Sequence, residues 1–380
     1  MRLCVPPDFR DWIEGLGIPV TPIGPELRRL TASSPPGTLT SLSLDRRRQM
    51  MAATVATQFE TVAAAADGCD IIVGATALQI AARSVAETLG IPYVFVAFCP
   101  TVLPSPHHAP IQLGAIGDSL APETADNRDL WAQDARRWND GWGDLLNGHR
   151  VAVGLAPVSD VRRHIFTDRP WLAADPTLAP WPESTDHTVM QTGAWLAPDE
   201  RPFSPELEAF LDGGEPPIYF GFGSIRAPEH LSRVMVESAR AVGRRAIVSR
   251  GWADLSLVDD RADCLAIGEV NQQALFTRVA AVVHHGGAGT TTAAARGGAP
   301  QVVVPQMYDQ HYWARRIHEL GVGTAHAAGA PTTDSLRDAL ERTLQLEVVA
   351  RAHAVASVMR TDGAETAANR LMDSDAEKSF

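Results

Sequence analysis

The chain has 380 residues, of which 45% are apolar, so it is long enough for two domains that each bury a core. Its formal net charge of −12 disfavours nucleic acid as a partner, because the negative field would repel the backbone phosphates. No stretch approaches the roughly 18 uninterrupted apolar residues of a membrane span, and the four cysteines form no CxxC pair, so we expect no membrane partner and a reducing, cytoplasmic location.

The first half alternates strand-like and helix-like segments. Alanine-rich stretches at 50–66 and 78–89 are predicted to be helices. Four short apolar runs around them are predicted to be strands, at 18–23, 70–74, 93–98 and 171–174. Apolar runs this continuous are typical of strands covered on both faces, as in a parallel sheet. Residues 1–191 are therefore predicted to form one α/β domain.

A long surface loop is predicted at 100–124, which is rich in proline, glycine and histidine. His107 and His108 in this loop are either exposed polar residues or part of a ligand pocket. In the helix that follows, three tryptophans at spacings of seven and four share one face: Trp131, Trp138 and Trp142. That face either packs on the core or forms an aromatic wall for a bulky apolar ligand.

The segment 192–205 carries three prolines amid charged residues and is the predicted linker. Beyond it the strand and helix pattern restarts, so residues 206–360 are predicted to form a second open α/β domain. The strands expected there are 218–222, 246–249, 264–267, 281–284 and 301–304. Residues 361–380 are predicted to hold a helix that packs back on the first domain, followed by a tail.

The strongest functional signal is the glycine-rich turn 284–290, between a predicted strand and a helix expected to begin near Thr290. The only lysine is Lys378, so an anion bound at this turn must be held by backbone N–H groups, histidine or arginine. Unpaired N–H groups and the positive end of a helix dipole form such a site. His285 can add a hydrogen bond to a phosphate, and Thr290 can both cap the helix and donate. His284 is expected to face a neighbouring strand.

Two weaker signals follow other strands of the same predicted sheet, where ligands of doubly wound folds bind. Ser224 comes after two glycines and can donate to a phosphate, although such glycines are also common in plain turns. Val270 can place its main chain against a nucleobase edge, with Trp252 stacking nearby.

A further signal is an amide and carboxylate group of residues after the strand 301–304, namely Gln306, Asp309 and Gln310. A carboxylate accepts from two neighbouring hydroxyls, while an amide both donates and accepts, so this group suits a sugar. Capping of the helix predicted at 312–320 is the alternative role for Asp309.

Together these residues resemble the nucleotide-sugar-dependent glycosyltransferases of the GT-B fold, and more narrowly those that act on vancomycin-type glycopeptide aglycones. The resemblance spans nearly the whole chain and is carried by the segments 171–176, 192–195, 250–255, 267–271, 284–290 and 305–310. It implies two Rossmann-like domains with open parallel sheets facing across a cleft, and no cofactor other than the nucleotide-sugar co-substrate. The implied reaction is an inverting, metal-independent transfer of a hexose from a UDP- or dTDP-sugar to a hydroxyl of a bulky aglycone, by a monomer.

The resemblance also implies a set of donor-binding residues. They are Ser224, Trp252, Val270, His285, Gly287, Ala288, Gly289, Thr290, Gln306, Asp309 and Gln310. The resemblance implies that the helix N-terminus and His285 stabilise the leaving diphosphate, and that Asp309 and Gln310 recognise the sugar.

One feature of that family is not matched. Its members open with a strand, a turn that carries an aspartate general base, and a helix, whereas Leu3 and its neighbours resemble the family's second strand. A unit on the order of 30 residues is therefore expected to be missing from residues 1–191, and no residue is assigned as the catalytic base. Two alternatives stay open: a catalytically inactive sugar-nucleotide binder and a sugar-nucleotide epimerase on the same fold.

Overall fold

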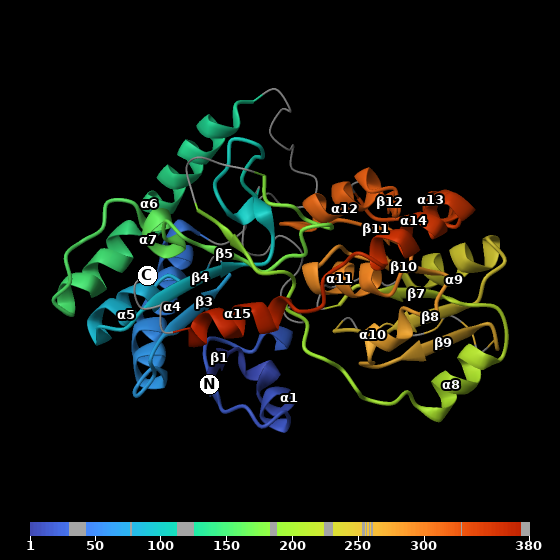
Figure 1. Ribbon diagram of the computed structural model, residues 1–380, viewed down its shortest axis with the longest axis horizontal. Coiled ribbons are helices and arrows are strands. Elements are labelled where there is room, and N and C mark those ends of the chain that lie inside the picture. Colours follow the sequence, from blue (N-terminus) through green and yellow to red (C-terminus); the bar gives the residue numbers. More distant parts are fainter. Residues whose placement is uncertain are drawn as a thin grey trace.

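The computed structural model describes residues 1–29, 43–76, 78–111, 125–182, 188–223, 231–252, 255, 257, 259, 261–327 and 329–373. Figure 1 shows two lobes, the first half of the chain forming one and most of the second half forming the other. Each lobe is built around a parallel sheet with helices packed against it, as the sequence predicted. None of the described helices is long and apolar enough to span a membrane.

The second lobe contains a six-stranded parallel sheet in the order β12-β11-β10-β7-β8-β9. If β7 to β12 are numbered 1 to 6, the order read from β9 to β12 is 3-2-1-4-5-6. This is the strand order of a Rossmann sheet, and the direction of winding reverses between β7 and β10. The strands are β7 (Ile218–Gly221), β8 (Ala246–Ser249), β9 (Cys264–Ile267), β10 (Ala281–His284), β11 (Gln301–Val303) and β12 (Gly323–Ala325). All five predicted strands are confirmed, and β12 is an addition.

Helices follow most of the strands of this lobe. They are α8 (Pro205–Asp212), α9 (Leu231–Ala241), α10 (Gln272–Leu275), α11 (Ala288–Arg296), α12 (Gln310–Glu319), α13 (Thr333–Thr343) and α14 (Leu346–Ala356). Residues 192–204, which were predicted to be linker, join β6 to α8 without a helix or strand.

The first lobe contains a four-stranded parallel sheet in the order β3-β4-β5-β6. Its strands are β3 (Ile72–Ala75), β4 (Tyr93–Ala97), β5 (Trp171–Leu172) and β6 (Met190–Gln191), and its helices are α4 (Leu44–Ala65), α5 (Ala82–Leu89), α6 (Asn127–Ala152) and α7 (Val161–Phe166). Helix α4 begins earlier than predicted because the hydroxyl of Ser43 accepts from the N–H of Arg46 and caps it.

The N-terminal strands stand apart from that sheet. β1 (Leu3–Val5) pairs with β2 (Val20–Pro22) in a separate two-stranded parallel sheet. The short helices η1 (Pro7–Phe9) and α1 (Arg10–Gly15) lie between these two strands in the chain. Elsewhere in this lobe, the short helix η2 (Pro100–Val102) follows β4. Among the described strands, β1 pairs only with β2, and β3 only with β4. The expected absence of a strand–helix unit stays a prediction.

The tryptophan face of α6 packs on the core, in agreement with the first of the two predicted roles. Trp131 is buried, and Trp138 and Trp142 pack against the cluster that contains Phe95. His107 is exposed, whereas the half-buried ring of His108 lies edge-on to Trp131. Most of the loop that carries these histidines, at 112–124, lies outside the described residues.

The chain crosses between the lobes twice, at residues 192–204 and just before α15 (Gly363–Met372). Helix α15 packs back on the first lobe, where Ala367 joins a buried cluster with Val94 and Val96 of β4. The two crossings are both held by Arg296 at the end of α11, whose Nη2 donates to the carbonyl oxygens of Ala194 (3.4 Å) and Arg360 (2.6 Å).

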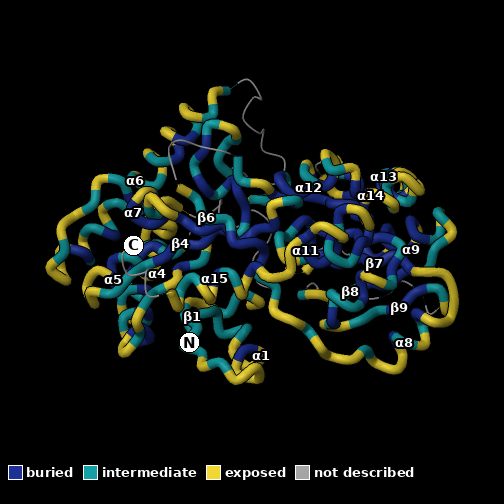
Figure 2. The backbone as a smooth tube through the Cα atoms, viewed as in Figure 1, coloured by how far each residue is buried: buried dark blue, intermediate teal, exposed yellow. Residues whose placement is uncertain are grey.

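Figure 2 shows the buried residues concentrated in the strands of both lobes and where the lobes meet. One apolar cluster contains Phe95 and Leu172 of the first lobe together with Trp313 and Ile317 of α12. Helix α12 is therefore one of the elements through which the second lobe shares a core with the first; α14 is another, through Ala352 and Val355.

Candidate functional site

The candidate site lies at the carboxyl ends of β7 and β10, which are adjacent and parallel. His284 at the end of β10 is in register with Gly221 at the end of β7. The winding of the sheet reverses between these two strands, and ligands of open α/β sheets bind outside the strand ends at such a point. The glycine-rich turn predicted to bind phosphate is therefore where the topology alone would place a ligand.

The helix that leaves the turn is α11, and it begins earlier than expected. The first intrahelical bond is donated by the N–H of Thr291 to the carbonyl of Gly287 (2.9 Å), and Gly287 is the N-cap. The expectation that Thr290 caps the helix is therefore wrong, since Thr290 lies within the first turn. Because Gly287 has no side chain, no cap oxygen competes for the N–H groups of Ala288, Gly289 and Thr290.

His284 shapes this turn from within the core. Its Nε2 lies 2.8 Å from Oε1 of Gln301 on β11, as expected for a residue facing a neighbouring strand, and its Nδ1 accepts from the N–H of Gly286 (3.1 Å). Complete burial lowers the pKa of His284 to about 3, so the ring is neutral and carries its proton on Nε2. No sequence pattern indicated the bond to Gly286, which fixes the start of the turn.

Gly286 is a position where only glycine fits. Its φ is +95°, and a Cβ there would lie 2.7 Å from Cγ1 of Val303 and 3.1 Å from the carbonyl oxygen of Gln310. The backbone of the turn and the loop that ends at Gln310 are therefore in direct contact, and the structure brings these two predicted motifs together.

The ring of His285 lies between two glycines of the site. A Cβ on Gly223 would lie 3.1 Å from its Cε1, and a Cβ on Gly287 would lie 2.6 Å from its Nε2. Burial lowers the pKa of His285 to about 4, although the Gly221 backbone counteracts this, and Nδ1 is buried without a hydrogen bond of normal geometry. Near pH 7 the ring is thus a neutral hydrogen-bonding group beside the N-terminus of α11.

The loop before α12 is held together by its own side chains. Oε1 of Gln310 accepts from the N–H groups of Gln306 (2.7 Å) and Met307 (3.1 Å), so this oxygen is engaged within the protein. Gln310 was expected both to donate to and to accept from a sugar, and only its amide N–H₂ remains for that role. Tyr308 takes up the tight turn with φ +56°, a conformation that is rare for a tyrosine.

Asp309 occupies the N-cap position of α12 but makes no side-chain capping bond. Its Oδ2 instead accepts from the indole N–H of Trp313 (2.9 Å), one turn along the helix. Burial raises the pKa of Asp309, which the bond from Trp313 counteracts. Capping, the alternative role for Asp309, is therefore not what its carboxylate does.

The amino-acid sequence is similar to those of known proteins. Residues 248–369, which include the turn and the loop before α12, match the family of the erythromycin biosynthesis protein CIII-like C-terminal domain. The chain is 51% identical to vancomycin aglycone glucosyltransferase of Amycolatopsis orientalis, over 98% of this chain and 90% of that protein. It is 43% identical to dTDP-epi-vancosaminyltransferase of the same organism, over 93% of this chain and 85% of that protein. The chain belongs to the GT-B glycosyltransferases.

The fold agrees with this membership. The crystal structure of the kitacinnamycin glycotransferase superposes with a TM-score of 0.68 at 18% identity, covering 98% of this chain and 90% of that one. The chain is accordingly a transferase that uses a nucleotide sugar, and the six-stranded lobe carries the predicted donor-binding residues of this glycosyltransferase.

Two of the remaining predicted donor-binding residues, Trp252 and Val270, follow the neighbouring strands β8 and β9. The N–H of Trp252 donates to the carbonyl of Gly223 (3.1 Å), so the loop after β8 adjoins the loop after β7. The indole of Trp252 is 6.0 Å from the ring of Phe9, between centroids, so the expected base-stacking residue contacts the first lobe. Val270 follows β9 and packs partly on a core cluster, and Ser224 lies outside the described residues.

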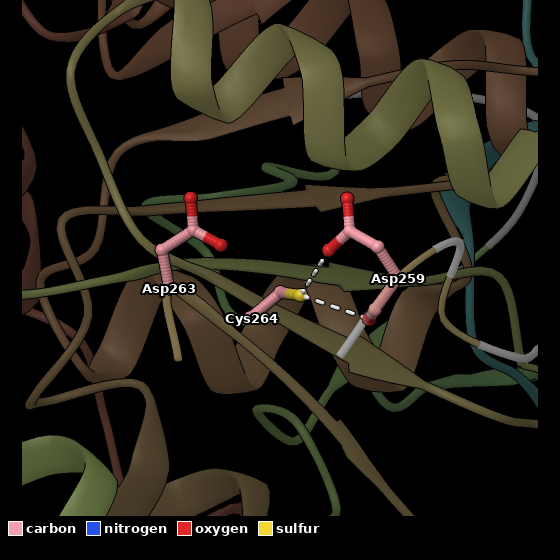
Figure 3. Close-up of side chains that lie close together, drawn as sticks. All are labelled: Asp259, Asp263 and Cys264. Atoms are coloured by element: carbon pink, nitrogen blue, oxygen red, sulfur yellow. Dashed lines mark hydrogen bonds between the residues drawn. The ribbon is translucent and has the colours of Figure 1, made fainter. Parts of the chain in front are cut away.

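One further group of side chains in the glycosyltransferase has the composition of a metal site. Asp259, Asp263 and Cys264 lie close together near the start of β9 (Figure 3). The guanidinium of Arg240 donates to all four carboxylate oxygens at 2.7–2.8 Å. The guanidinium of Arg240 therefore supplies the positive charge of this cluster, and we interpret the cluster as an ion-pair network.

Proposed function

We propose that the protein is an inverting, metal-independent glycosyltransferase that moves a hexose from a UDP- or dTDP-sugar to a hydroxyl of a glycopeptide aglycone. The observation that carries the proposal is the uncapped N-terminus of α11 beside His285, at the point where the winding of the Rossmann sheet reverses. The N-cap residue Gly287 makes no side-chain capping bond, and among the described residues the neutral imidazole of His285 lies beside this helix end.

The leaving diphosphate is the group that this end of α11 suits. Its negative charge grows as the bond to the anomeric carbon breaks, so fixed donors stabilise the transition state more than the ground state. The N–H groups of Ala288, Gly289 and Thr290 and the ring of His285 supply those donors without a lysine or a metal ion. Inversion follows if the acceptor hydroxyl attacks the carbon from the opposite side.

The sugar ring is proposed to lie over the loop before α12. The carboxylate of Asp309 accepts from sugar hydroxyls, and the amide N–H₂ of Gln310 donates to one. Gly286 contacts Gln310, so this loop lies beside the glycine-rich turn 284–290 that is proposed to bind the diphosphate. A nucleotide sugar needs such adjacent sites because its sugar is bonded directly to the diphosphate.

The acceptor is proposed from the relatives. Vancomycin aglycone glucosyltransferase, by its name, glucosylates a glycopeptide aglycone, and the chain covers 90% of that protein at 51% identity. We extend that acceptor class to this protein, and propose glucose ahead of an amino-deoxysugar because the Asp–Gln pair of the loop suits hydroxyls. We also propose that the protein is a monomer in the cytoplasm; the four free cysteines fit that location.

The test is to incubate the protein with vancomycin aglycone and UDP-glucose or dTDP-glucose, with and without EDTA. We expect a glucosylated product by mass spectrometry, with the β-anomer identified by NMR, and no loss of rate in EDTA. Product that forms only with added divalent metal, or that retains the donor's anomeric configuration, would contradict the proposed mechanism.

The two alternatives are separated by the same mixtures. An inactive binder retains affinity for UDP or dTDP in calorimetry while no product forms with any aglycone. An epimerase converts the donor in the absence of acceptor, which NMR of the nucleotide sugar alone detects.

A further inference from the structure

Trp313 is the largest fully buried side chain that the structure describes, and it contacts the proposed donor site through Asp309. It lies on α12 with 1% of its surface exposed, in the core cluster shared by both lobes. Its indole N–H donates to Oδ2 of Asp309, four residues earlier, over 2.9 Å. Residues four apart lie on the same helix face, so α12 itself aligns the two side chains.

This bond replaces the one that Asp309 would ordinarily make. An aspartate before a helix accepts from the first-turn N–H groups when its backbone is extended. Here the backbone of Asp309 is helical, with φ −71° and ψ −9°, and its side chain makes no capping bond. The carboxylate therefore accepts from the indole N–H of Trp313 and not from the first-turn N–H groups of α12.

The rest of the loop is fixed independently. The amide oxygen of Gln310 binds the backbone at Gln306 and Met307, which sets the path of the chain without using Asp309. The carboxylate of Asp309 is then oriented by the indole of Trp313 and by the backbone N–H of Asp309 itself. Oδ1 has no side-chain donor within the part of the chain that the structure describes.

Burial of an indole does not by itself require a carboxylate partner. The buried Trp131 satisfies its N–H with a backbone carbonyl, that of His108, at 2.8 Å. In Trp313 the same need is met by the one acidic side chain of the loop, whose charge makes the bond stronger and more directional. If Trp313 only filled the core, its N–H would not need to bind Asp309, the residue proposed to bind the sugar.

We propose that Trp313 is a positioning residue, which orients the Asp309 carboxylate so that its free oxygen meets the donor sugar. Trp313 then governs how much more tightly the enzyme holds a nucleotide sugar than the nucleotide diphosphate alone. This inference rests on the proposed function.

The test compares UDP-glucose with UDP, and dTDP-glucose with dTDP, by calorimetry on the full chain. Trp313→Phe keeps an aromatic ring and removes the N–H. We expect it to weaken binding of the sugar nucleotides about tenfold and to leave UDP and dTDP within about twofold, the scale of one charge-assisted hydrogen bond. In turnover assays KM for the donor should rise more than kcat falls. Trp131→Phe, which removes an equivalent N–H elsewhere, is the matched control and should change neither affinity.

A double-mutant cycle distinguishes positioning from packing. If Trp313 acts through Asp309, Trp313→Phe should have no further effect on sugar-nucleotide affinity once Asp309→Ala is present. Equal losses in both backgrounds would mean that Trp313 only fills the core, and the inference would be wrong.

A measurement on the wild-type protein covers the case in which Trp313→Phe does not fold. With indole-¹⁵N-labelled tryptophan, the N–H resonance that moves in Asp309→Asn identifies Trp313. It should shift on adding UDP-glucose and stay in place with UDP; a shift of equal size with both would overturn the inference. Wild-type protein that binds none of the four nucleotides would instead refute the proposed function.

Discussion

Gly363 at the start of α15 lies against Gly193 in the segment between β6 and α8. A Cβ on Gly363 would be 2.4 Å from the carbonyl carbon of Gly193 and 2.5 Å from the carbonyl oxygen of Ala194. Two backbones, one from each crossing between the lobes, therefore touch without any side chain between them.

Gly363→Ala is expected to destabilise the protein, because neither backbone can move without disturbing α15 or the other crossing. Overpacking of this kind costs about 1–3 kcal/mol, measured as a lower urea midpoint. Gly148→Ala in α6 is the matched control: its Cβ would meet nothing within 4 Å, and alanine favours a helix over glycine by roughly 0.5–1 kcal/mol. A destabilised Gly148→Ala or an unchanged Gly363→Ala would contradict the assignment.

His285→Ala should weaken binding of UDP and dTDP by about 1 kcal/mol, or roughly fivefold. The imidazole is neutral at pH 7, so the loss is that of an ordinary hydrogen bond. Calorimetry of both nucleotides measures it. His318→Ala, at an exposed position of α12, is the control and should leave both affinities unchanged. Unaltered affinity in His285→Ala would remove this residue from the phosphate site.

His284→Phe should affect both stability and ligand binding, although His284 itself touches no ligand. The phenyl ring fills the space but leaves the N–H of Gly286 and the amide of Gln301 without their partner, at about 1–3 kcal/mol for each buried group. We expect a lower urea midpoint together with weaker UDP binding, because the turn loses the bond that sets its start. Weaker folding with unchanged UDP affinity would show that the turn holds its shape without His284.

Two buried histidines, His164 and His284, and the half-buried His285 are neutral near pH 7 and predict that the protein is acid-labile. Burial lowers the pKa to about 3 in His164 and His284 and to about 4 in His285, against 6.5 for the free side chain. Below pH 6.5 the unfolded chain takes up protons that the folded chain does not, so stability is lost as the pH falls toward 4. Each histidine contributes up to about 1.4 kcal/mol per pH unit.

Thermal unfolding between pH 7.5 and 4.5 tests this pH dependence. The melting temperature should fall steadily below pH 6.5. His164→Asn lacks one titrating group and should show a shallower fall, whatever its melting temperature at pH 7.5. Parallel curves for the two proteins would mean that His164 is protonated in the folded state.

The positions of the ligand motifs were predictable from the sequence, since strand ends in a parallel sheet share one edge and glycine turns there are easily recognised. The start of α11 was not predictable, because Gly289 is a poor helix former and made Thr290 look like the first helical residue. The two-residue strand β6 and the three-residue strand β12 are too short to show periodicity.

The hydrogen-bond partners of the side chains in the loop before α12 could not be predicted from the sequence either. The type of residue at 309 and 310 indicated sugar hydroxyls, but it could not show that Gln310 has its oxygen engaged by backbone or that Trp313 holds Asp309. Each of these bonds depends on a local backbone conformation, such as the positive φ of Tyr308, that residue type alone does not determine.

Helix α11 begins at the turn proposed to hold the diphosphate and ends at Arg296, which binds both crossings between the lobes. Nine residues of α-helix span only about 14 Å and bend little over that length. The first turn of this short helix and its last residue, which binds both crossings, therefore cannot move independently. A shift of the first turn toward a bound phosphate would therefore displace Arg296 and strain its bonds to the carbonyl oxygens of Ala194 and Arg360.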